Sequence, residues 1–248
     1  MRGDVHEAGA LRVRFPREHF SRLDATIVNV AGGMTGGDEF DLRFGALAGA
    51  QLFVSSAAAE KIYRTTGQAT RVSVKLSAEA GSLCVWLPQE TIIFNRANLV
   101  RTLEADVTSA SRLVACEMTI LGRAAMGETV DDLAWRERWR IRRGGRLVVA
   151  EDTRIDGNAM MHLSREPLGA GAHAFATLVY VANGAAAACE QMRANFADQE
   201  CKCETGVTAY EDIVIARFAA KDGQSLRSSV VACLRAIEGL TLPRGWYT

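Results

Sequence analysis

Residues 69–107 read ATRVSVKLSAEAGSLCVWLPQETIIFNRANLVRTLEADV, and this stretch decides the fold. Four apolar or alternating segments follow one another within it, separated by short connections that contain Gly, Pro or Asn, at 69–77, 82–87, 91–94 and 98–107. Alternation with a period of two and β-branched residues are typical of strands, and no connection is long enough for a helix. The stretch therefore predicts consecutive strands and argues against a doubly wound α/β sheet.

The same pattern continues on both sides of this stretch. Further strands are predicted at 25–30, 39–44, 51–55, 111–120, 133–141 and 146–155. A strand recurs about every ten residues, which favours a mainly β body built as a sandwich, a barrel or a helix-like stack of sheets. No strict internal repeat is visible, so a regular solenoid is not supported.

The last third of the chain changes character. Residues 168–189 carry no Asp, Glu, Lys or Arg, but they are rich in Ala and Gly and are interrupted by Asn183-Gly184. A membrane-spanning helix needs about 20 strongly apolar residues, so a buried strand, a turn and a helix start explain this segment better. Helices are predicted at 185–198 and 225–237, with a strand at 210–218 between them. We expect a single domain over residues 1–248, with a β body at about 20–180 and a helical part at about 184–240.

Composition excludes several classes of function. The 29 basic and 29 acidic residues of the 248-residue chain cancel, so no global field attracts nucleic acid or an anionic membrane. The six cysteines are too few for a disulfide scaffold and are interpreted as reduced thiols. The charged N-terminal stretch lacks the apolar run of a secretory signal, which predicts a cytoplasmic protein.

A glycine-rich segment, Ala31-Gly32-Gly33-Met34-Thr35-Gly36-Gly37-Asp38, follows a predicted strand. It is no phosphate loop, because the Gly-Lys-Ser/Thr that would supply the ammonium and the magnesium ligand is missing. A sharp turn with close backbone approach is favoured. The functional alternative is Asp38, whose carboxylate at a rigid turn is an oxygen ligand suited to a divalent metal.

Other segments have a structural interpretation, and some of them also have a functional one. Glu60-Lys61-Ile62-Tyr63-Arg64 is typical of a solvated turn with local ion pairs. Within residues 86–92, the carboxylate of Glu90 lies at a strand end, where it is well positioned to bind a ligand. Glu117 lies between apolar neighbours, so it either pairs with an arginine or serves a ligand. In 135–143, alternation puts Trp135, Glu137, Trp139 and Ile141 on one face and an arginine ladder on the other, where an acidic protein partner is the functional alternative.

Evidence for catalysis is weak. Cys201-Lys202-Cys203 lacks a nearby histidine, and the four histidines are scattered, so neither a zinc site nor a nucleophile with its base stands out. The prediction is a protein that is not an enzyme. The alternative is a metal-dependent enzyme that uses Asp38, Glu90 and Glu128.

Five segments in order resemble the UreD (UreH) family of urease accessory proteins: 32–38, 60–64, 86–92, Gly122-Arg123-Ala124-Ala125-Met126-Gly127-Glu128, and Leu242-Pro243-Arg244-Gly245-Trp246. The resemblance runs from about residue 25 to the C-terminus. The chain departs from the family at its start, where members usually carry additional residues that form early strands. The resemblance implies an irregular β-helix-like stack of strands with a small helical part of two helices in the C-terminal third.

The resemblance also implies a function. Proteins of this family act in a nickel metallochaperone complex: they bind apo-urease and recruit UreF, which holds the GTPase UreG, for nickel insertion into urease. The helices are the family's docking region for UreF. Asp38, Glu117 and Glu151 match acidic positions implicated in a transient nickel path, with no permanently bound cofactor. Exchangeable oxygen ligands suit transfer, since cysteine or histidine cages would hold nickel too tightly.

Overall fold

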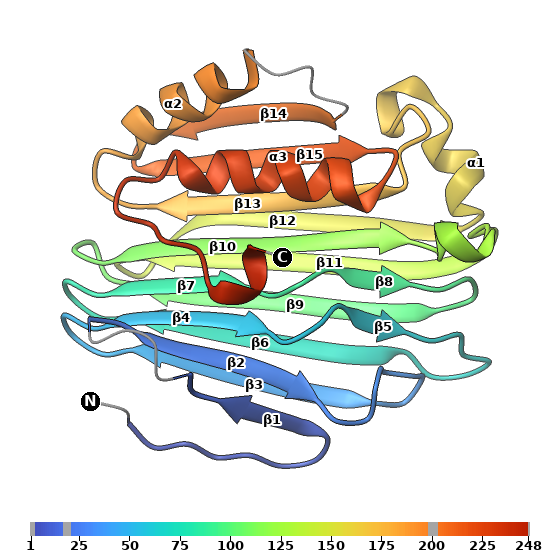
Figure 1. The fold of residues 1–248 in the computed structure, drawn as a ribbon, viewed down its shortest axis with the longest axis horizontal. Helices are drawn as coiled ribbons and strands as arrows, with labels where there is room; N and C mark the ends of the chain where they lie inside the picture. The colour runs from blue at the N-terminus through green and yellow to red at the C-terminus, as the bar shows by residue number, and fades with distance from the viewer. Residues whose placement is uncertain (1–2, 17–20, 198–202, 248) are drawn as a thin grey trace.

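A computed structural model describes residues 3–16, 21–197 and 203–247 of the protein. Within these residues the chain forms two packed β-sheets with helices on one side (Figure 1). The ten-stranded sheet contains β1 (Leu11–Arg14), β2 (Leu23–Asn29), β4 (Gln51–Ser56), β5 (Glu60–Ile62), β7 (Leu83–Leu87), β8 (Thr91–Ile93), β10 (Arg112–Leu121), β13 (Ala174–Val181), β14 (Cys203–Tyr210) and β15 (Ile213–Ala220). The five-stranded sheet contains β3 (Glu39–Ala46), β6 (Thr70–Ala78), β9 (Asn98–Val107), β11 (Leu133–Arg143) and β12 (Arg146–Gly157).

The chain winds between the two sheets like an irregular solenoid. Strands β2, β4, β7 and β10 pair in parallel in one sheet, and β3, β6, β9 and β11 pair in parallel in the other. Each coil therefore adds one rung to both sheets, which explains the even strand spacing in the sequence. Antiparallel strands complete the stack, with β1 at one end and β12, β13, β15 and β14 at the other. The predicted mainly β, β-helix-like stack is confirmed.

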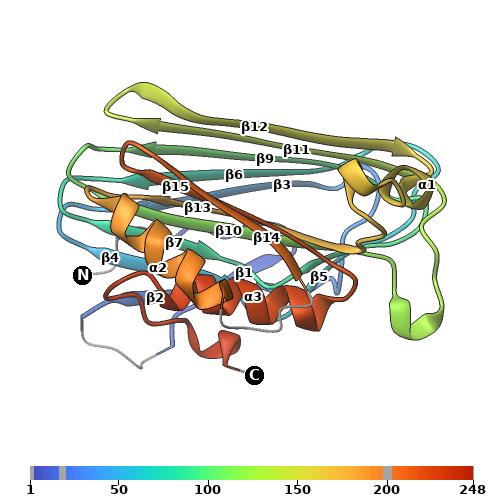
Figure 2. The same ribbon diagram turned by 90° about the horizontal axis from the view of Figure 1, so that it is seen from above.

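Two helices, α2 (Ala185–Ala197) and α3 (Gly223–Arg235), cover the outer face of the ten-stranded sheet, as Figure 2 shows. The third helix, α1 (Ala159–Leu163), and three short 3₁₀ turns, η1 (Ala124–Met126), η2 (Glu166–Leu168) and η3 (Arg244–Trp246), lie in connections. The predicted pair of C-terminal helices is thereby confirmed, while Asp198 of the first lies outside the described residues. Among the described segments, every helix is too short or too polar to cross a membrane.

The layers create separate apolar cores. One lies between the ten-stranded sheet and the helices, and two lie between the sheets. Strand β10 contributes to both sides, because Cys116 and Met118 pack toward the helices whereas Ala115 and Glu117 point toward the five-stranded sheet. A carboxylate is thus buried between two sheets.

The expected solvated turn at 60–64 is wrong for its first three residues. They form β5, which pairs in parallel with β8 and leaves Ile62 only 1% exposed. The pairing gives the backbone groups of this short segment partners that a sequence pattern does not reveal. Strands β1 and β14 were not predicted either: β1 alternates but is only four residues long, and β14 shows no regular alternation of apolar and polar residues.

The glycine-rich segment is a tight turn held against its neighbours. A Cβ at Gly33 would lie 2.3 Å from the Tyr63 ring, and one at Gly36 would lie 2.5 Å from the Gln68 carbonyl oxygen. Real Cβ atoms do not approach a backbone oxygen so closely, so glycine is required at Gly36. The expected close approach of the backbone is what the geometry shows.

Candidate functional site between the two sheets

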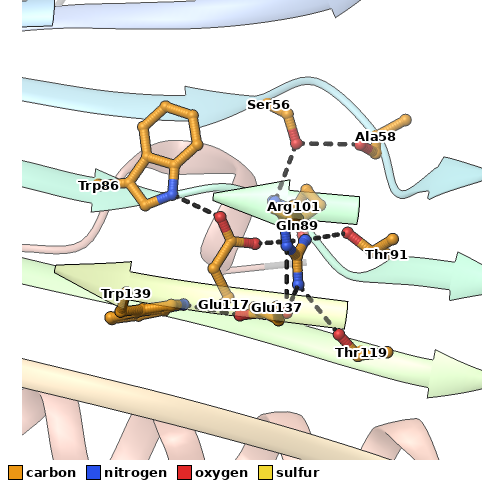
Figure 3. Close-up of polar contacts among 10 residues, drawn as sticks. All are labelled: Ser56, Ala58, Trp86, Gln89, Thr91, Arg101, Glu117, Thr119, Glu137 and Trp139. Atoms are coloured by element: carbon orange, nitrogen blue, oxygen red, sulfur yellow. Dashed lines mark hydrogen bonds and ion pairs between the residues drawn. The ribbon is translucent and has the colours of Figure 1, made fainter. Parts of the chain in front are cut away.

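A buried arginine lies between the two sheets (Figure 3). Arg101 projects from β9 of the five-stranded sheet and is 4% exposed. Its Nη1 lies 2.7 Å from Oε2 of Glu117 on β10, in the opposite sheet. Its Nη2 lies 2.5 Å from Oε2 of Glu137 on β11, its register partner in the same sheet. The guanidinium therefore joins the sheets through two carboxylates.

Hydroxyl groups complete the surroundings of the guanidinium. Arg101 Nη1 donates to Oγ1 of Thr91 at 2.8 Å, and Nη2 donates to Oγ1 of Thr119 at 3.1 Å. Arg101 Nε also donates to Oε2 of Glu137, at 3.2 Å. Thr91 and Thr119 are register partners on β8 and β10, so one parallel pair of strands presents both hydroxyls. Each N–H group of the buried guanidinium has an oxygen acceptor, which a buried charge requires.

Two tryptophans hold the outer oxygens of the carboxylates. Trp86 Nε1 donates to Glu117 Oε1 at 2.7 Å, and Trp139 Nε1 donates to Glu137 Oε1 at 2.8 Å. The result is one continuous chain of side chains in the order Trp86, Glu117, Arg101, Glu137, Trp139 (Figure 3). Each member hydrogen-bonds or pairs with the next, so this network is a connected polar core between two apolar ones.

The network carries two carboxylates for one guanidinium. Burial raises the pKa of Glu117 from its usual 4.5 to about 7; the nearby charge of Glu137 acts in the same direction, against Arg101 and the Trp86 hydrogen bond. Burial disfavours the charged form of Arg101, but the charges of Glu117 and Glu137 raise its pKa overall. The guanidinium therefore stays charged, and Glu117 is the carboxyl poised to take up a proton.

This raised pKa predicts how stability depends on pH. Below about pH 4.5, Glu117 is protonated in both the folded and the unfolded chain. Between about 4.5 and 7 only the unfolded chain loses the proton, so the free energy of unfolding should fall as pH rises, by up to about 3 kcal/mol in total. The Glu117→Gln variant has no carboxyl to titrate at this position, so its free energy of unfolding should lack this dependence on pH. Urea unfolding of both proteins from pH 4.5 to 8 measures the difference, and parallel pH curves would contradict the assignment.

Cavities lie on both sides of the network. The larger, about 830 Å³, lies between β11 and β12 on one side and β10, β13, β14 and β15 on the other, and residues 162–169 form part of its wall. Glu117 and Glu137 line it. A smaller cavity of about 70 Å³ is lined by Arg101 and again by Glu117. The network therefore separates two hollows in the space between the sheets.

The hollow space continues toward the β1 end of the stack. The smaller cavity contains Glu60, which accepts hydrogen bonds from Asn29 Nδ2 and the Lys61 backbone N–H. Burial raises the pKa of Glu60. A third cavity, of about 970 Å³, shares Leu11, Ile27 and Leu42 with the smaller one. Acidic side chains thus recur along a line of three adjoining cavities.

The three predicted nickel-path residues lie apart from one another. Asp38 lines the third cavity, and its Oδ2 accepts the Thr35 backbone N–H at 2.8 Å within its own turn. Glu117 is in the central network. Glu151 on β12 is ion-paired with Arg217 on β15, and Arg217 lines the 830 Å³ cavity. The structure brings none of the three together, but it places each in or beside the line of cavities.

The residues of the alternative enzyme do not form one site. Glu90 is ion-paired with Arg227 of α3 at 2.8 Å. Glu128 is ion-paired with Arg123 at 2.8 Å, which together with backbone hydrogen bonds from Asn95 and Arg123 lowers its pKa. Asp38 lies elsewhere, in the glycine turn. Across residues 3–16, 21–197 and 203–247, no three His, Cys, Asp or Glu side chains are grouped to hold a metal.

The remaining predicted features have structural roles. Glu137, Trp139 and the rest of their face are buried, as expected, and the opposite face carries Arg136 in an exposed ion pair with Asp152. The five described cysteines are buried: Cys84, Cys116, Cys189, Cys203 and Cys233. Burial raises the pKa of Cys84 and of Cys233 to about 12, so these thiols remain protonated. Cys201 lies outside the described residues.

Sequence reasoning found Glu117 but missed Arg101 and Glu137 as members of a site. Both left a signal. In β9, Leu99, Arg101 and Leu103 share one face, and in β11, Glu137 shares the face of the two tryptophans. A charged residue on an apolar strand face predicts a buried partner, and three such residues occur in neighbouring strands.

Comparisons with known proteins agree with these observations. The family model described as UreD urease accessory protein matches residues 3–247. Urease accessory protein UreD 3 of Bradyrhizobium sp. (strain BTAi1) is 41% identical over 245 residues, which cover 99% of this chain and 87% of the relative. Urease accessory protein UreD of Rhodopseudomonas palustris (strain HaA2) is 42% identical with the same coverage. The chain therefore belongs to the UreD family of urease accessory proteins.

Proposed function

We propose that the chain acts in urease maturation as a scaffold and nickel conduit and is not itself an enzyme. Its relatives are named urease accessory proteins, which supports the role in maturation. The observation that carries the conduit is the line of adjoining cavities between the sheets, with Glu117, Glu60 and Asp38 along it. Nickel is the cargo in this proposal, and no permanently bound cofactor is needed.

The chemistry of the cavity walls suits a transferred cation. Carboxylate oxygens attract Ni²⁺, yet isolated carboxylates exchange it readily because they supply few ligands at a time. Apolar clusters between the two sheets flank these carboxylates. A path of separated carboxylates passes an ion on, whereas a closed cage would keep it.

The scaffold role concerns the outer surface. Helices α2 and α3 lie on the face of the ten-stranded sheet away from the cavities, so a protein docked there would leave the path free (Figure 2). We assign this helical face to UreF, which would bring the GTPase UreG, and we place apo-urease as the receiver of nickel. These partners imply a cytoplasmic hetero-oligomer.

The conduit is tested by replacing the three carboxylates of the predicted nickel path, those of Asp38, Glu117 and Glu151, with amides of the same shape. A chain with Asp38→Asn, Glu117→Gln and Glu151→Gln should still bind UreF, because the helical face is unchanged, but urease activation should fall severalfold. The matched control changes three exposed acids that line none of the three cavities, Glu104→Gln, Asp106→Asn and Asp131→Asn. Urease activity in nickel-supplied cells and co-purification of UreF are measured together. Normal urease activation by the three-amide chain would contradict the conduit. If the three-amide chain no longer co-purified with UreF, the substitutions would instead have damaged the scaffold.

A further inference from the structure

The network around Arg101 is the partition between two of the cavities. Glu117 lines both the 830 Å³ and the 70 Å³ cavity, while Glu137 lines only the larger and Arg101 only the smaller. Arg101 is 4% exposed and holds both carboxylates at 2.5–2.7 Å. Any ion that moved between these cavities would therefore pass the guanidinium and its two carboxylates.

The guanidinium occupies a site made for a cation. Four oxygen atoms from four side chains converge on it: Glu117 Oε2, Glu137 Oε2, Thr91 Oγ1 and Thr119 Oγ1. Carboxylate and hydroxyl oxygens are also ligands that divalent metal ions accept. The outer carboxylate oxygens are held by Trp86 and Trp139, so the inner ones would stay in place if the guanidinium withdrew.

The charge balance favours a divalent ion over the guanidinium. With both carboxylates ionised, the site carries two negative charges, and Arg101 compensates only one of them. A divalent cation would compensate both, and uncompensated charge is costly in a buried place. The same four oxygens therefore have two competing occupants, one built into the chain and one from outside.

We propose that Arg101 is a gate that closes the passage between the two cavities, and that the oxygens around its guanidinium form a transit site for a divalent cation when the side chain withdraws. This inference rests on the proposed conduit and adds its control point. Arg101 acts as a competitor: it yields the site to the incoming ion and, on returning, displaces the ion onward. The guanidinium and the ion exclude each other by both charge and space.

The site is tested with Arg101→Gln, which removes the competing cation and leaves all four oxygens. In equilibrium dialysis with NiCl₂, the full chain carrying Arg101→Gln should bind about one equivalent, at least about tenfold more tightly than the wild-type chain, whose closed gate lowers its apparent affinity. Affinity for one set of oxygen ligands should rise from Mn²⁺ through Co²⁺ to Ni²⁺. The matched control adds Glu137→Gln, which removes one carboxylate and should abolish the gain.

Folding of the variant is itself informative. Arg101→Gln leaves two buried carboxylates without a cation, so the variant should be less stable than the wild type and should regain stability with Ni²⁺. Recovery by Ni²⁺ that is absent when Glu137→Gln is added supports the site. An Arg101→Gln chain that binds no Ni²⁺, or that stays unfolded when Ni²⁺ is present, overturns it, because the ion then fails to replace the guanidinium.

Urease activation separates the gate from a merely structural role and from the conduit. If Arg101 displaces nickel, Arg101→Gln should lower activation while the nickel that co-purifies with the chain rises. If Arg101 had only a structural role, Arg101→Gln would lower both urease activation and the amount of nickel that co-purifies with the chain. That outcome overturns the gate. If Arg101→Gln binds Ni²⁺ but the chain with Asp38→Asn, Glu117→Gln and Glu151→Gln (the three-amide chain) activates urease normally, the conduit is contradicted and the cation site is supported. If the three-amide chain is inactive and Arg101→Gln binds nothing, the gate alone fails.

Discussion

Replacing Arg101 by leucine should destabilise the protein by about 3–5 kcal/mol, more than any surface arginine in the same sheet. The substitution leaves the carboxylates of Glu117 and Glu137 facing each other between two sheets, where each is less than 10% exposed. It also removes the side chain that joins the two sheets in this network. Urea unfolding at pH 8, where the carboxylates of the variant are under most pressure to ionise, gives the largest effect.

Two controls define the origin of this loss. Arg136→Leu, on β11 of the same sheet, removes an arginine whose side chain is 44% exposed and paired with Asp152, so it should cost no more than about 1 kcal/mol. Adding Glu117→Gln and Glu137→Gln to Arg101→Leu removes the stranded charges while keeping acceptors for the two tryptophans. This triple change should recover most of the stability. A triple variant as unstable as Arg101→Leu alone would mean that packing, rather than charge, sets the cost.

The positions of most strands in the body followed from the sequence, because each coil of the chain repeats the same local pattern. Segments such as 98–107 place apolar residues at most alternate positions, and the short turns between segments leave no room for crossover helices. Which strand of one sheet lies opposite which strand of the other is a different matter. The period of two gives the face of Glu117 but not the strand that faces it, since that depends on how both sheets stack.

The site illustrates this limit. Arg101 and Glu117 are 16 positions apart in neighbouring segments, and each looks like an isolated polar interruption of an apolar face. Only the stacked register brings them to 2.7 Å and shows that Glu117 pairs with an arginine, one of its two expected roles. Its other expected role, service to a ligand, is the one that the cavities beside it motivate. The position of Asp38 beside a cavity was out of reach for the same reason, because cavities form between elements and leave no pattern in either one.

The C-terminal motif shows how distant segments fix the helical layer. Trp246 is 3% exposed, and its Nε1 donates to the Leu87 carbonyl at 2.9 Å, across 159 positions of sequence. Arg227 of α3 lies over the Trp246 ring, with 4.9 Å from Cζ to the ring centre, and donates to the Gly245 carbonyl. The same arginine pairs with Glu90 at 2.8 Å. The final residues therefore clamp α3 to the end of β7.

Trp246→Ala should accordingly cost about 3–5 kcal/mol, through the lost burial of a large aromatic side chain and the cavity left behind. The Leu87 carbonyl would lose its partner, and Arg227 would lose the ring that it covers. The neighbouring Tyr247 is 61% exposed, so Tyr247→Ala is the matched control and should change stability by no more than about 0.5 kcal/mol. Urea unfolding measures both variants, and limited proteolysis should cut the C-terminal segment of Trp246→Ala first, because the segment then lacks its anchor. Equal stability of the two variants would show that the clamp contributes nothing and that α3 is held by its own buried face alone.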